Sequence, residues 1–81
     1  MRSMNQTAAI LRQALCIAGR PVTIDRRTFY SRVYQRMLTK YTVKLRDPDT
    51  GKITERLETY KLSEVIRYLA ERYLEEKDHD R

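Results

Sequence analysis

The amino-acid pattern predicts an α+β fold in which three helices pack against a two-stranded antiparallel hairpin, in the order α-α-β-β-α. Two segments, 5–18 and 62–76, repeat their apolar residues with the period of a helix. Residues 41–57 instead alternate apolar and polar groups on both sides of the turn sequence Asp-Pro-Asp-Thr-Gly at 47–51. The intervening segment 26–40 places its apolar residues on one half of a helical wheel, so we assign it to a further helix.

All 81 residues are expected to form one small domain, with frayed ends at residues 1–4 and 78–81. A domain of this size buries only about 60% of the surface of its unfolded chain, so its hydrophobic core is thin. An interface between two copies would add to that core. We therefore expect a homodimer.

The first helix has apolar groups at Ala8, Leu11, Leu15 and Ala18. Either Asn5 or Thr7 is a suitable N-cap, and Gly19 is a suitable stop. Residues 20–24 follow as an extended connector or short strand, because residues before proline avoid the helical region and residues 22–24 are β-branched.

The second helix is expected at 26–40, with Asp25 or Thr28 as its cap. Its aromatic and aliphatic residues share one side, which favours packing in a core or an interface over the stacking of nucleobases. These residues are Phe29, Tyr30, Val33, Tyr34, Met37 and Leu38.

The hairpin register follows from placing residues 47–51 in the loop. Leu45 then lies opposite Ile53, Val43 opposite Glu55, and Tyr41 opposite Leu57. Val43 faces the core, and Glu55 is the exception on this apolar face. A third helix from Leu62 to about residue 76 completes the fold, with Tyr68 away from its apolar stripe, outside the core, where its ring would suit an interface.

Positive charge is concentrated in the first half of the chain. Residues 1–47 hold ten bases and two acids, whereas residues 48–81 hold seven bases and nine acids, and the net charge is +6. On the expected second helix, Arg32, Arg36 and Lys40 recur every four residues and repel one another. Phosphate would relieve this repulsion, because each neutralised phosphate also releases counterions.

The sequence therefore predicts a small, non-catalytic nucleic-acid-binding protein, with DNA and RNA both open. The basic surface is expected on the second helix and the first hairpin strand. Its candidate residues are Arg26, Arg27, Arg32, Arg36, Lys40, Lys44 and Arg46.

A basic surface can also serve solubility alone, or it can receive an acidic protein partner. A different alternative is a regulatory or protein-interaction module that uses the C-terminal amphipathic helix. A helix-turn-helix is disfavoured, because residues 19–25 are too long and too β-branched for its usual turn.

Enzymatic chemistry finds little support in the residues. The one histidine, His79, falls in the expected frayed tail, and the single cysteine, Cys16, has no histidine on a neighbouring element. Zinc-ligand spacing and glycine-rich phosphate loops are absent from the sequence, so we expect no metal and no cofactor. The single cysteine and the lack of a long apolar run indicate a soluble, cytoplasmic chain without membrane contact.

Overall fold

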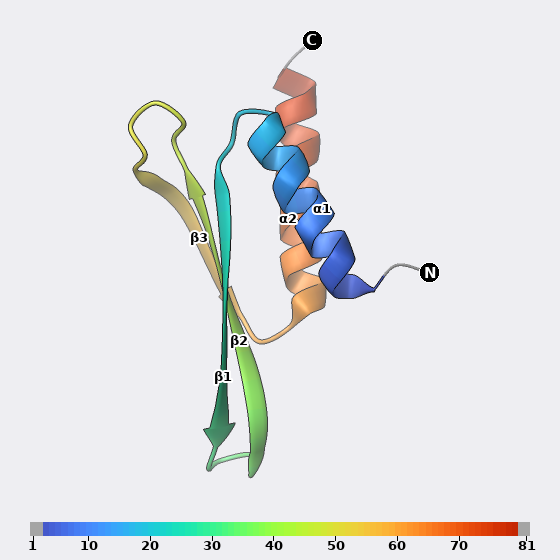
Figure 1. The fold of residues 1–81 in the computed structure, drawn as a ribbon, viewed down its shortest axis with the longest axis vertical. Helices are drawn as coiled ribbons and strands as arrows, with labels where there is room; N and C mark the ends of the chain where they lie inside the picture. Colours follow the sequence, from blue (N-terminus) through green and yellow to red (C-terminus); the bar gives the residue numbers. More distant parts are fainter. Residues whose placement is uncertain (1–2, 80–81) are drawn as a thin grey trace.

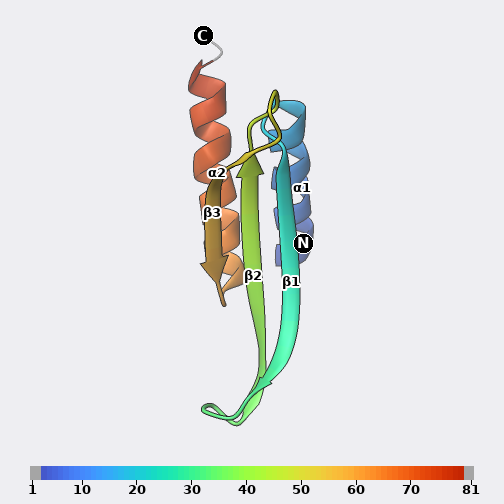
Figure 2. The same cartoon turned by 90° about the vertical axis from the view of Figure 1, so that its left-hand side faces the viewer.

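The computed structural model describes residues 3–79 and shows two helices packed on one face of a three-stranded antiparallel sheet. The elements follow the order α1 (Met4–Ile17), β1 (Val22–Ser31), β2 (Arg36–Arg46), β3 (Ile53–Thr59) and α2 (Leu62–His79). The strands form a simple meander with β2 in the centre. Both helices lie side by side behind the sheet, so no helix of residues 3–79 covers its opposite face (Figures 1 and 2).

The prediction of three helices and a two-stranded hairpin is wrong, because residues 26–40 form no helix. They are the end of β1, a turn and the start of β2, with Phe29 opposite Leu38 and Tyr30 opposite Met37. Aromatic and β-branched residues suit a strand, but their spacing here also satisfies the helical wheel. The turn has no glycine, proline, asparagine or aspartate to identify it; Gln35 occupies the left-handed region there, at φ 52°.

Helix α1 begins before either of the predicted caps. Ser3 is the N-cap: its hydroxyl accepts a hydrogen bond from the Gln6 backbone N–H, and the Gln6 side chain accepts one from the Ser3 N–H. The predicted stop at Gly19 is confirmed. Gly19 has φ 99°, and the Arg20 N–H bonds back to the Leu15 carbonyl at 2.9 Å, which closes the last turn.

The β2–β3 hairpin is confirmed, but its register differs from the predicted one by two residues. Leu45 lies opposite Glu55 and Val43 opposite Leu57, with an irregularity between Leu45 and Arg46. The Asp47 carboxylate holds the loop by accepting hydrogen bonds from the backbone N–H groups of residues 49 and 50. A shift by two residues keeps every side chain on the expected face of the sheet.

The core lies between the sheet and the helices, at the end of the sheet away from the β1–β2 turn (Figure 1). Its buried apolar side chains come from every element but β3. Val43 on the central strand has 0% exposure, which confirms its predicted inward orientation. The buried cluster consists of Leu15, Val22, Val43, Leu45, Val65 and Leu69.

The β1–β2 hairpin continues past the ends of both helices as an uncovered arm, which we define as residues 28–39 (Figure 1). The arm carries large exposed side chains, with Tyr30 and Met37 on the helix side and Val33 and Tyr34 at the turn. A two-stranded ribbon without a packing partner is only marginally stable. The arm is therefore the part of this fold that most needs a ligand or partner.

Of the frayed ends predicted at residues 1–4 and 78–81, residues 1–2 and 80–81 lie outside the described residues. Met4 and Asp78 lie within α1 and α2. Neither of the helices within residues 3–79 is long and apolar enough to cross a membrane.

Candidate nucleic-acid interface

Successive side chains of a strand point to opposite faces of the sheet, and this alternation decides which predicted basic residues share a surface. Val22 and Val43 face the helices, so the odd-numbered residues of β1 and the even-numbered residues of β2 face away. Five of the seven predicted residues thereby lie on the helix-free face: Arg27, Arg36, Lys40, Lys44 and Arg46.

The other two predicted residues lie elsewhere. Arg26 points toward the helix side, where it lines a shallow hollow with Asn5, Arg12 and Tyr41. Arg32 sits in the turn between β1 and β2. The line of Arg32, Arg36 and Lys40 expected on a helix does not exist, because a strand places every second residue on one face and the turn separates Arg32 from the other two.

Arg56 completes this surface, although the sequence did not predict it there. It lies on β3 directly opposite Lys44. The predicted register paired Lys44 with residue 54, and the acidic composition of the second half of the chain gave no reason to place a cation at this point. Only the observed β2–β3 register, which pairs Lys44 with Arg56, places this cation on the surface.

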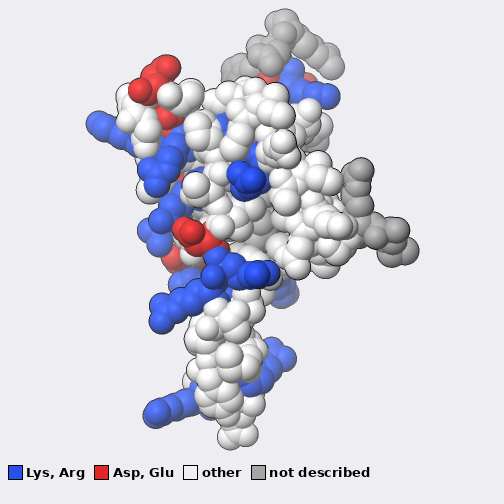
Figure 3. Space-filling model, viewed as in Figure 1, with Lys and Arg blue, Asp and Glu red and all other residues white. Residues whose placement is uncertain are grey.

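We call these six side chains the basic face: Arg27, Arg36, Lys40, Lys44, Arg46 and Arg56. Figure 3 shows that Lys and Arg atoms gather along the side of the molecule formed by the sheet, with further basic atoms on the arm. The sheet thus brings together cations that are far apart in the chain, from residue 27 on β1 to residue 56 on β3.

Two carboxylates, Asp25 and Glu58, lie among these cations and offset part of their charge. Glu58 lies 2.8 Å from the Arg56 guanidinium and 3.6 Å from the Lys40 ammonium, and Asp25 lies 3.9 Å from the Lys44 ammonium. The hydrogen bond from Arg56, followed by the charge of Lys40, holds the pKa of Glu58 below its usual value.

Arg27 and Arg36 make no ion pair with any residue in the range 3–79. With six cations and two carboxylates, the basic face keeps an excess of positive charge for an external anion.

An aromatic hollow adjoins the basic face on the same side of the arm. Phe29, Tyr34, Leu38 and Tyr60 line it together with Arg36. Tyr60 comes from the β3–α2 connector and meets Phe29 edge to face, with ring centroids 6.3 Å apart. The Arg36 guanidinium lies 5.8 Å from the centroid of the Tyr34 ring.

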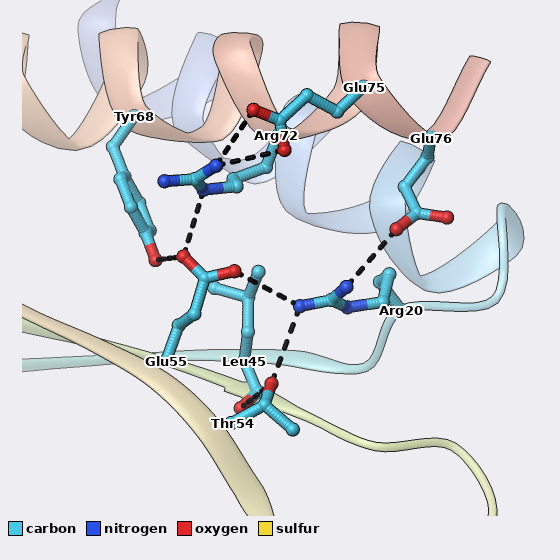
Figure 4. Close-up of polar contacts among 8 residues, drawn as sticks. All are labelled: Arg20, Leu45, Thr54, Glu55, Tyr68, Arg72, Glu75 and Glu76. Carbon is cyan, nitrogen blue, oxygen red and sulfur yellow. Dashed lines mark hydrogen bonds and ion pairs between the residues drawn. The ribbon is translucent and has the colours of Figure 1, made fainter. Parts of the chain in front are cut away.

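The helix side carries a different cluster, which joins α2 to β3 and to the α1–β1 connector (Figure 4). The Glu55 carboxylate accepts a hydrogen bond from the Tyr68 hydroxyl at 2.8 Å and forms ion pairs with Arg72 at 2.9 Å and Arg20 at 3.3 Å. Arg20 also forms an ion pair with Glu76 at 3.2 Å. Burial, reinforced by the hydrogen bond to Glu55, raises the pKa of Tyr68.

This cluster bears on the alternative of an interaction surface on the C-terminal helix. Tyr68 was expected outside the core, but it packs against the core and donates its hydroxyl hydrogen to Glu55. The polar groups on this side of α2 are therefore already occupied in holding the fold together.

Among the side chains that the structure describes, in residues 3–78, no three His, Cys, Asp or Glu groups lie close enough to hold a metal ion. No family model, curated protein or solved structure matches this chain.

Proposed function

We propose that this protein binds nucleic acid through the basic face of its sheet. The proposal depends on the convergence of six cations from three strands on the sheet face that no helix of residues 3–79 covers. Only two carboxylates lie among them in the described part of the chain, and Arg27 and Arg36 have no ion-pair partner there.

Phosphate is the anion that suits this arrangement. The cations follow β2 at intervals of two to four residues, which correspond to about 7–14 Å along the strand. A row of separated charges matches a polyanion better than a single small anion, because each cation meets its own phosphate and releases its own counterions. Arginine, which forms bidentate contacts with phosphate, supplies four of the six cations.

Fluorescence anisotropy of labelled oligonucleotides, measured from about 50 to 200 mM salt, tests the proposal. We expect the logarithm of the affinity for a single strand to fall with the logarithm of salt concentration, with a slope of about −0.7 per phosphate neutralised. About four contacts would therefore give a slope near −2.8.

The diagnostic variant carries Arg27→Gln, Lys40→Gln and Lys44→Gln, which removes three cations from the basic face. Its slope is expected to be shallower by about 2. The matched control carries Arg12→Gln, Arg67→Gln and Lys77→Gln, which removes the same charge from exposed positions on the helices. An equal loss in both variants, or no binding by the wild type at low salt, would refute the assignment of this face.

The homodimer expected from the thin core stays a prediction. Light scattering coupled to gel filtration, with and without oligonucleotide, measures the mass directly.

A further inference from the structure

We infer, on the basis of the proposed function, that the aromatic hollow on the arm receives an unpaired nucleobase, so that the basic face selects single-stranded nucleic acid over duplex. The hollow has a volume of ≈ 540 Å³. This lies within the range of roughly 300–1,000 Å³ that small-molecule sites occupy.

The exposure of the side chains around the hollow indicates that the protein's own fold leaves them without a partner. Tyr34 is 66% exposed, Tyr60 56% and Val33 85%. The arm extends beyond the helices, and no other described element covers this side of it (Figure 2). Exposed apolar side chains that gather in one place, unlike single ones, are typical of binding surfaces.

The walls of the hollow are held in place from two directions. Phe29 and Leu38 lie opposite each other on β1 and β2, and Tyr60 reaches Phe29 from the connector that leads into α2. The Tyr34 backbone N–H donates a hydrogen bond to the Ser31 hydroxyl at 3.3 Å. These contacts restrain the Phe29 and Tyr60 rings and the backbone at Tyr34 before any ligand arrives, which lowers part of the entropy cost of binding.

Nucleobases match the chemistry of this hollow because both of their faces are flat π surfaces that stack on aromatic rings. The neighbouring cations Arg36, Arg27 and Lys40 lie on the same face of the sheet and are placed to hold the phosphates on either side of the bound base. In a duplex each base is already stacked between its neighbours and offers only its edges to a protein. A hollow that takes a whole base therefore requires an unpaired strand.

The experiment compares three labelled probes of about 20 nucleotides: a thymidine single strand, a strand of the same length with an abasic site at every position, and a duplex. Wild-type protein is expected to bind the intact single strand at least about fivefold more tightly than either of the other probes, since one stacked base contributes about 5- to 150-fold in affinity.

The variant Tyr34→Ser with Tyr60→Ser removes the two exposed rings of the hollow. It is expected to lose this preference while it keeps the salt slope and the affinity for the duplex. The matched control is Tyr30→Ser with Met37→Ser, a pair that is 58% and 59% exposed on the opposite side of the same arm and should bind like the wild type. Circular dichroism melts establish that both variants are folded.

Equal binding of all three probes by the wild type would overturn this inference and leave the proposed function intact. An equal loss in the control variant would also overturn it, because the effect would then belong to the arm and not to the hollow. Absence of binding to every probe at low salt would refute both proposals.

Discussion

Replacing Glu55 with glutamine isolates the charge at the centre of the helix-side cluster. Glutamine has nearly the same shape, and its side-chain carbonyl still accepts the hydrogen bond from Tyr68, but the change removes the ion pairs with Arg20 and Arg72. It also puts an amide N–H donor in place of the oxygen that accepts a hydrogen bond from Arg20, so that bond is lost with the charge. The side chains of these three charged residues are 26–33% exposed, which places them between surface and interior. Each pair is then expected to contribute about 0.5–1 kcal/mol.

The Glu55→Gln variant should therefore lose about 1–2 kcal/mol in its free energy of unfolding, equivalent to a fall of roughly 5–15 °C in Tm for a domain of this size. Urea unfolding and thermal melts followed by circular dichroism measure both quantities.

The control is Glu58→Gln, which removes an ion-paired carboxylate from the exposed basic face and should cost less stability, because its partners Lys40 and Arg56 are more exposed to solvent. A Glu55→Gln protein as stable as the wild type, or a loss equal to that of the control, would show that the ion pairs do not hold α2 on the sheet.

Single substitutions also test the core, the two turns and the response to high pH. Val43→Asp places an unpaired charge at a position with 0% exposure and should abolish cooperative unfolding; a normal melt would contradict this. Gly51→Ala should cost roughly 1 kcal/mol in a urea titration, because Gly51 has φ 74°. Gln35→Gly should raise stability by about 0.5 kcal/mol in the same assay, since φ 52° strains a residue with a Cβ. The raised pKa of Tyr68 means that its contribution to stability is complete below the unfolded pKa of about 10 and is lost as pH rises through the folded pKa. Melts across this alkaline range should therefore differ between wild type and Tyr68→Phe, and identical pH dependence would show that Tyr68 is not the group responsible.

Local signals predicted the elements whose ends carry distinctive residues. Helix α1 ends at Ile17, just before the left-handed Gly19; the β2–β3 loop is built on the Asp47 carboxylate and Gly51; and α2 begins at Leu62, as predicted. The arm was missed because its turn has none of these residues. The spacing of tyrosine, arginine and valine in residues 26–40 is compatible with both a helix and a strand. Only capping or turn residues at the ends of this segment would distinguish the two.

The candidate site was predicted in composition but not in geometry. Five of the seven basic residues share the helix-free face, although they were expected partly on a helix. Arg56 lies beside them because β3 pairs with β2 in the observed register. Tyr60 lines the aromatic hollow because its ring contacts Phe29, a residue that is distant in the chain. Neither partnership has a signal in the local sequence.

Relations between neighbouring residues were enough to predict the two outer helices, the polar β2–β3 turn, the inward orientation of Val43 and the excess of positive charge in the first half. Periodicity, capping and turn chemistry all act over a few residues, which is why a single sequence reveals them. Long-range packing settled the rest: residues 26–40 are mainly strand, both helices cover the same face of the sheet, and the basic face and the aromatic hollow lie together on the other. These outcomes depend on pairing between distant strands and on burial against helices, which override local propensity.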